Sequence, residues 1–432
     1  MIKDLLDEKW FQSLRDIYDG VPARLVASSY NEARKKFFDG DDAAPNFSYS
    51  IISDQRFKEK KSALTLLREQ IHNCNTTHPV VKKIYLQKID EKLSSLDIVR
   101  VASELVSSDT CDGLLASKFI SLTNKVFGPV QPDVFAQACA VVLRQLSDLS
   151  ISTEQYRVFS NVANVLERGT ASSQHSIADL EIQSKVPEGA LVTDQSVVIR
   201  QFKSALEEHG FGHWKVEPGG KLQTTFVVKS KHNRIVVPNQ TALRNRVGNA
   251  KITERKLQAI IAHEMTHVLR YEHGINSPLR LLAIGLPGYH SGEEGYATYC
   301  EQQIQGATDY AGGKYYIAAG LAAGLDRGGE SRNFREMYNF MHDWYCLEES
   351  GGERDPKKLA FHFCSVLFKG VRGHNPGVFL TLQTSYREGN IAVHKAMAEY
   401  PDWEEFGRIG KYDFTNKTHV VALQELGILP SL

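Results

Sequence analysis

The chain has 432 residues, of which 42% are hydrophobic and 24% charged, so we expect a globular protein with more than one substructure. Lys and Arg number 51, and so do Asp and Glu, which leaves no electrostatic argument for binding nucleic acid or an anionic membrane. No apolar run is long enough to span a membrane, and acidic residues near the start argue against a secretory signal. The six cysteines are scattered without a CxxC pair, which favours free thiols and a cytoplasmic protein.

Residues 1–166 are predicted to form a helical N-terminal part. Apolar residues in segment 78–106 recur with a period near 3.6, as on one face of a helix. Two prolines mark a turn at 127–133, after which another helix is expected. The polar segment 168–190 lacks a clear period, so we interpret it as a long connection and as the domain boundary.

Residues 190–432 are predicted to form a second, catalytic part of α+β class. A helix at 194–209 precedes three short segments rich in Val, Ile, Thr and Phe, which we expect to form a short antiparallel sheet. A helix that Thr253 can cap and Gly274 can end follows the sheet. The remaining helices are expected at 294–305, 312–323, 331–346, 356–369 and 388–400.

The helix after the predicted sheet carries the letters HEMTH. His263 and His267 lie one turn apart on the same face, so both imidazoles can bind one zinc ion. Glu264 is rotated by about 100° from His263 and can miss the metal. It can instead take a proton from a water whose pKa zinc lowers to about 7, as in metallopeptidases with the HExxH motif. The alternative interpretation is a pair of histidines in a protein core.

A catalytic zinc site takes a third protein ligand and keeps its fourth position open. Glu293 and Glu294 lie downstream at the start of a predicted helix that can pack against the first. One of these carboxylates would complete a set of two histidines and a glutamate. The other can interact favourably with the helix dipole. His290 is a further candidate ligand.

The stretch 262–301 resembles the core of the QEGLA-motif metallopeptidases, a family that includes the microtubule-associated tyrosine carboxypeptidases and many bacterial proteins. The matching elements are the HE and TH pairs of the HEMTH segment and the segments NSPL (276–279) and GLPGY (285–289). The segment EEGYA (293–297) stands in place of QEGLA. The resemblance implies that Glu294 is the glutamate ligand and that Glu293 replaces the glutamine. It also implies a helix-rich zincin-like fold, one Zn²⁺ per chain and removal of a C-terminal residue.

The chain departs from the family pattern at three places. Only two residues separate Glu264 and His267, where the family commonly has three; this is the spacing of most zincins, so metal binding should persist. The Arg-Gly element of the family reads FKGVRG here, which makes Lys369 and Arg372 candidates to hold a terminal carboxylate, unless they belong to a solvated basic loop. Segment 380–384 replaces a Thr-Lys-Asp, which leaves substrate preference open.

Tyr386 matches a tyrosine of the family, and its hydroxyl can donate to an oxyanion or serve structure alone. The sequence therefore predicts a zinc carboxypeptidase acting on a peptide or protein tail. Release of tyrosine is one expectation, with tubulin as the substrate if the host has it. The alternatives are an endopeptidase or amidase on the same site, and a module that binds a protein tail without cleaving it.

Overall fold

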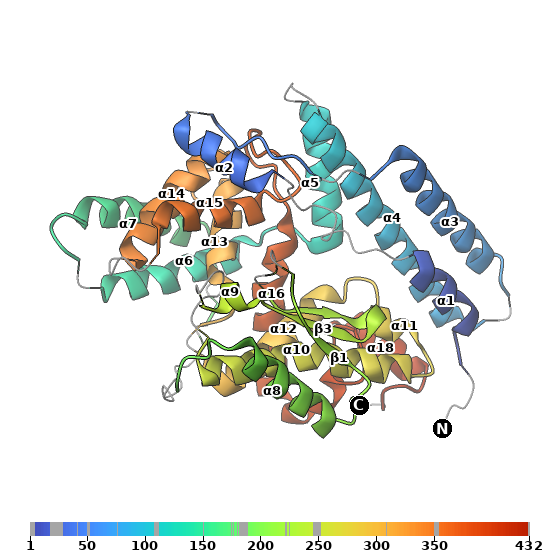
Figure 1. Ribbon diagram of the computed structural model, residues 1–432. Coiled ribbons are helices and arrows are strands. Elements are labelled where there is room, and N and C mark those ends of the chain that lie inside the picture. The colour runs from blue at the N-terminus through green and yellow to red at the C-terminus, as the bar shows by residue number, and fades with distance from the viewer. Residues whose placement is uncertain are drawn as a thin grey trace.

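The structure is a computed structural model (Figure 1). It describes all residues except 1–4, 18–28, 41, 50–51, 76, 108–111, 150, 174, 176, 179, 181–188, 221–222, 224, 245–251, 308, 350–353 and 431–432. Much of the connection expected at 168–190 and the cysteine at position 111 therefore lie outside the described residues. The five described cysteines are free thiols.

The N-terminal part is helical, as predicted. Pro132 begins one of its helices, where a missing N–H costs nothing, and Asp112 caps another with its side chain. Among the described residues, no single helix combines the length and apolar character needed to cross a membrane; α5 and α6 satisfy that test only as a pair, across an 82° bend. The helices are α1 (Glu8–Ile17), α2 (Tyr30–Asp39), α3 (Asp54–His72), α4 (Pro79–Ser107), α5 (Gly113–Phe127), α6 (Pro132–Ser147) and α7 (Tyr156–Thr170).

The second part begins with α8 (Gln195–Glu208) and continues through a small sheet into a long run of helices. The helix-rich α+β class is therefore confirmed. After the sheet come α9 (Gln240–Arg244), α10 (Glu254–Ile275), α11 (Leu281–Ile284), α12 (His290–Gln305), α13 (Gly313–Ala322), α14 (Phe334–Glu348), α15 (Pro356–Leu367), α16 (Thr384–Glu399), α17 (Glu404–Gly407) and α18 (Lys417–Glu425). Short 3₁₀ turns occur at η2 (Ser230–His232), η3 (Thr381–Gln383) and η4 (Pro401–Trp403).

The sheet is mixed, so the prediction of a purely antiparallel sheet was wrong. Its strands are β1 (Lys215–Pro218), β2 (Val227–Lys229) and β3 (Arg234–Val237), in the order β1-β3-β2. The tight turn at η2 makes β2 and β3 antiparallel, and Asn233 occupies the left-handed region there with φ 50°. The connection 219–226 is long enough to carry the chain to the other side of β3, which leaves β1 parallel to β3.

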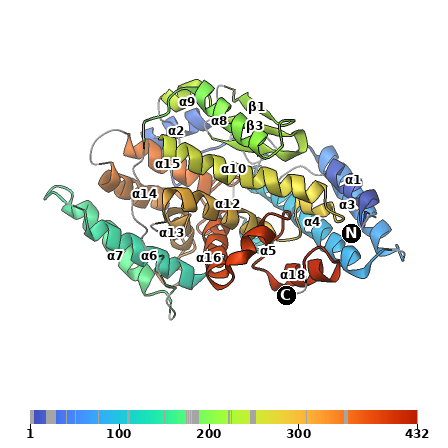
Figure 2. The same ribbon diagram turned by 90° about the horizontal axis from the view of Figure 1, so that it is seen from below.

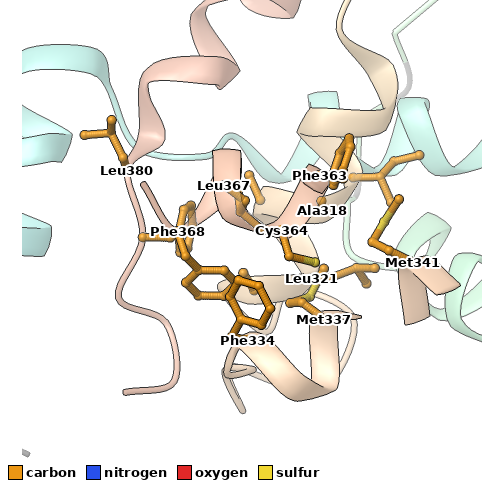
Figure 3. Close-up of a cluster of buried hydrophobic side chains, with 14 of the residues drawn as sticks. Ala318, Leu321, Phe334, Met337, Met341, Phe363, Cys364, Leu367, Phe368 and Leu380 are labelled. Atoms are coloured by element: carbon orange, nitrogen blue, oxygen red, sulfur yellow. The ribbon is translucent and has the colours of Figure 1, made fainter. Parts of the chain in front are cut away.

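Three clusters of buried apolar side chains form the interior. Figure 3 shows part of one, where α13, α14, α15 and the segment after α15 pack together. This cluster also includes residues of α2, α4, α5, α6 and α7, so N-terminal and C-terminal helices share it. A second cluster joins α1, α3 and α4 to α11, α16 and α18. The residues labelled in Figure 3 are Ala318, Leu321, Phe334, Met337, Met341, Phe363, Cys364, Leu367, Phe368 and Leu380.

The third cluster packs the sheet and α8 against α10. On its other side α10 packs against α12, and α12 packs against α16, as Figure 2 shows. The approach of α12 and α16 requires glycine. A Cβ on Gly295 would lie 2.3 Å from the backbone of Gly389, and a Cβ on Gly389 would lie 1.9 Å from the backbone of Ser291. This close contact holds α12 between α10 and α16, where the candidate site lies.

Candidate metal centre

Helix α10 positions the HEMTH residues. Thr253 caps the helix, since its side chain accepts a hydrogen bond from the backbone N–H of Lys256. Buried Met265 and Val268 pack into the third cluster on the other side of the helix. His263 and His267 therefore face the same way, with ring centroids 5.1 Å apart.

Helix α12 brings Glu294 to these two imidazoles. Its Oε2 atom lies 3.7 Å from Nε2 of His263 and 3.8 Å from Nε2 of His267. Donor atoms of the three residues all lie within 4.8 Å of one another. Donors around a tetrahedral zinc ion with bonds near 2.1 Å are separated by about 3.4 Å, so the two distances from Glu294 exceed that separation by only a few tenths of an ångström. The structure thus assembles the set predicted for the metal.

The second nitrogen of each imidazole faces another carboxylate of α12. Nδ1 of His267 is 2.8 Å from Oε1 of Glu293, and Nδ1 of His263 is 3.2 Å from Oε2 of Glu301. The contact at His267 is a hydrogen bond, and a carboxylate in this place favours the tautomer in which Nδ1 carries the proton and Nε2 keeps its lone pair for a metal. The contact at His263 has the distance of an ion pair without hydrogen-bond geometry. Glu301 was absent from the sequence prediction. Its spacing of seven residues from Glu294, two turns on the same helix face, is the signal that could have identified it.

Glu293 belongs to a buried ionic cluster. Its side chain is 2% exposed, and Oε2 lies 2.8 Å from Nη1 of Arg270, while Oε1 lies 3.2 Å from Nζ of Lys411. Burial alone would raise the pKa of Glu293, but Lys411, Arg270 and His267 hold this pKa far below its usual range. Glu293 lies outside the three-donor set, and its contacts are those of a residue that orients His267.

The carboxylates and imidazoles of the site shift one another's pKa values. Burial would raise the pKa of Glu294, yet His267 and His263 lower it to about 2. Burial would also raise the pKa of Glu301, but His263 and Lys256 lower it to about 2. Burial lowers the pKa of His263, but Glu294 and Glu301 raise it well above its usual value. In the protein without metal, a proton on His263 therefore offsets part of the negative charge of these carboxylates.

Glu264 differs from the other three carboxylates. Burial raises the pKa of this half-buried side chain, and the neighbouring histidines offset that effect only in part. A carboxylate whose pKa is raised toward neutrality is suited to accept and return a proton. Glu264 also lines a cleft beside the three donors, where a substrate can reach it.

Tyr386 and His290 complete the surroundings of Glu294. The Tyr386 hydroxyl lies near the Glu294 carboxylate, and the charge of Glu294, burial and the charge of Glu264 raise the pKa of the phenol well above its usual range. It therefore stays protonated and able to donate. The His290 ring packs edge-on against Tyr386 with centroids 6.2 Å apart. His290 is not part of the three-donor set.

The cleft beside the donors has a volume of about 360 Å³. It runs along the N-terminal half of α10 and is bounded by the segment before β2, by α9 and by α12. Apolar side chains make up much of its wall. The lining residues are Thr225, Phe226, Pro238, Ala242, Leu243, Ile252, Lys256, Ile260, His263, Glu264, Thr298, Glu301, Ala311 and Tyr386.

Lys369 and Arg372 lie in the loop between α15 and η3 and are half-buried. Neither is among the residues that line the cleft. The loop packs elsewhere: the Tyr49 hydroxyl donates to the carbonyl of Val371 at 3.3 Å, and the backbone N–H of Phe334 donates to that of Gly373 at 2.7 Å. Burial lowers the pKa of Lys369. A substrate-binding role for these two residues stays a prediction.

Comparison of the sequence with known proteins finds no matching family model and no matching curated protein.

Proposed function

We propose that this protein is a zinc metallopeptidase with a zincin-like core. His263, His267 and Glu294 would hold the metal, and Glu264 would act as general base and then as general acid. The observation that carries the proposal is the convergence of three donor atoms within 4.8 Å, with a carboxylate behind each imidazole. Two buried core histidines would not require this arrangement.

The residues present fit a divalent cation in two respects. Two imidazoles and one carboxylate are a donor set typical of catalytic zinc, which leaves a fourth position for water or substrate. The charge of the site also suits a cation. Four carboxylates, those of Glu264, Glu293, Glu294 and Glu301, meet three cationic side chains, those of Lys256, Arg270 and Lys411.

Zinc, when bound, supplies a Lewis acid that polarises a carbonyl group and lowers the pKa of water. Glu264 accepts a proton from the attacking water and returns it to the leaving amine. The peptide C–N bond breaks, the acyl carbon takes the oxygen of water, and the amine takes the proton. The Tyr386 hydroxyl, held beside Glu294, can donate a hydrogen bond to the carbonyl oxygen as its negative charge grows.

The sequence resemblance supports a narrower proposal. On that basis the enzyme removes a C-terminal residue from a peptide or protein tail, including the tyrosine of tubulin if the host has it. The five described cysteines are free thiols, which supports a cytosolic enzyme.

Incubation of the zinc-loaded protein with a peptide library, followed by mass spectrometry of the products, tests the proposal. Glu264→Gln should keep its zinc but lose at least about 100-fold in kcat, the usual size of a general-base contribution. Glu254→Gln, an exposed position on the same helix, is the matched control and should retain activity.

Each outcome of this experiment has a separate meaning. Loss of terminal residues supports a carboxypeptidase, whereas internal cuts favour an endopeptidase on the same site. Binding of peptides without cleavage by the zinc-loaded protein would overturn the proposal in favour of a binding module. Near-normal turnover by Glu264→Gln would assign the base to another residue.

A further inference from the structure

The cleft beside the candidate metal centre contains a positive charge that the proposed chemistry does not use. Lys256 is the one Lys or Arg among the described residues that line this cleft, and its side chain is 30% exposed. It lies on α10, seven residues before His263. Seven residues make two turns of helix, so Lys256 lies on the same face as the metal-binding imidazoles.

A single carboxylate links Lys256 to the candidate metal centre. Nζ of Lys256 lies 2.6 Å from Oε1 of Glu301, and the other oxygen of Glu301 lies 3.2 Å from Nδ1 of His263. The contacts through Glu301 therefore place the ammonium group on the same side of α10 as His263, in the cleft that adjoins the candidate metal centre. A substrate bound at the centre can extend along the cleft toward this group.

The surroundings of Lys256 suit an anionic group of the substrate. An ammonium has three N–H donors, and the contact with Glu301 engages one of them. Apolar side chains also line the cleft, among them Phe226, Leu243, Ile252 and Ile260. They make the cleft less polar than bulk water, which strengthens the attraction between an anion inside it and a nearby cation.

We propose that Lys256 binds the free C-terminal carboxylate of the substrate. This inference rests on the proposed function for the position of the reacting end. It assigns the carboxylate to α10 instead of the loop that holds Lys369 and Arg372, and it makes Lys256 a determinant of specificity for chain ends.

The test compares two peptides of the same sequence, one with a free C-terminal acid and one with a C-terminal amide. Binding is measured by fluorescence anisotropy in the zinc-loaded Glu264→Gln background, so that no peptide is consumed. Cleavage is measured in parallel with the active enzyme. Lys256→Met should weaken binding and kcat/KM for the free acid by roughly 10- to 150-fold, the value of a hydrogen bond to a charged group. Both values for the amide should change little.

Three further variants separate the proposed contact from indirect effects. Lys256→Arg keeps the positive charge and should keep most of the preference for the free acid. Lys369→Met and Arg372→Met should leave the ratio of the two peptides unchanged.

The proposal is overturned if the unmodified protein treats the two peptides equally, or if Lys256→Met retains the preference for the free acid. It is also overturned if Lys369→Met or Arg372→Met removes that preference. Selective binding of the free acid that depends on Lys256, without any cleavage, would retain the proposal and refute the peptidase function.

Discussion

Replacing Glu293 by glutamine separates the residue that supports a metal ligand from the ligand itself. The Glu293 carboxylate contacts three groups: Nδ1 of His267 at 2.8 Å, Arg270 at 2.8 Å and Lys411 at 3.2 Å. Glutamine has the same shape and keeps one acceptor oxygen, but it removes the negative charge. Glu294→Gln on the neighbouring residue is the matched variant, because it removes the same charge from the proposed ligand.

The structure sets the expected magnitudes. Arg270 is fully buried, and removing one member of a buried ion pair costs about 3–5 kcal/mol. We expect Glu293→Gln to lower the free energy of unfolding of the metal-free protein by about 3 kcal/mol, the lower end of that range. The loss is at the lower end because Arg270 also donates to the carbonyls of Gly410 and Tyr412 and so keeps other partners. Loss of an orienting partner typically weakens metal affinity by about 10- to 100-fold. Glu294→Gln should weaken zinc binding more, since it alters a direct donor.

Two measurements distinguish the effects of the two substitutions. Competition with a chelator of known affinity gives the zinc dissociation constant of each variant, and urea unfolding of the metal-free proteins gives their stability. If Glu293→Gln weakens zinc binding more than Glu294→Gln does, Glu293 is the ligand and the assignment of the two carboxylates is reversed. If Glu293→Gln leaves the stability of the metal-free protein unchanged, the buried pair with Arg270 does not hold this part of the fold.

Two further predictions concern the metal and the pH dependence of stability. Elemental analysis of protein purified without chelator should find one zinc per chain, and His263→Ala should abolish stoichiometric metal; unchanged metal content in that variant would place the ion elsewhere. In the metal-free protein the pKa values of Glu294 and Glu301 are lowered in the fold from 4.5 to about 2, so their contribution to stability is complete above pH 4.5 and is lost as the pH falls toward 2. Unfolding of the metal-free protein by urea at a series of pH values should therefore show a decline over this window, and a midpoint that stays constant between pH 5 and pH 2 would contradict the reasoning.

Local sequence was sufficient to predict the elements that carry the site. The possible cap at Thr253 and end at Gly274 predicted α10, and Thr253 caps it as expected. Two histidines one turn apart share a helix face in any α-helix, so their convergence needed no tertiary information. The end of α10 was less predictable. Gly274 does not terminate the helix, which continues to Ile275; it lies against the backbone of α11, where a Cβ would come within 2.4 Å of the Ala283 nitrogen.

The interpretation of the two adjacent glutamates, Glu293 and Glu294, needed both the sequence and the tertiary structure. The pattern of residues suggested that one binds metal and the other does not, and the resemblance to the QEGLA family selected Glu294. Only packing reveals what Glu293 does, because its partners Arg270 and Lys411 come from α10 and from the segment before α18. Long-range contacts of this kind depend on how the helices cross, which no local period specifies.

The substrate side of the site was decided by tertiary structure. Helix α16 begins at Thr384, earlier than the predicted 388, so Tyr386 lies on the helix that Gly389 brings against α12. That approach brings the phenol to Glu294. The sequence by itself identified the candidates for binding zinc and for transferring a proton, because both proposals depend on side-chain chemistry and helical spacing. Which side chains line the cleft, with Lys256 inside and Lys369 and Arg372 outside its lining, was decided by the packing of segments far apart in the chain.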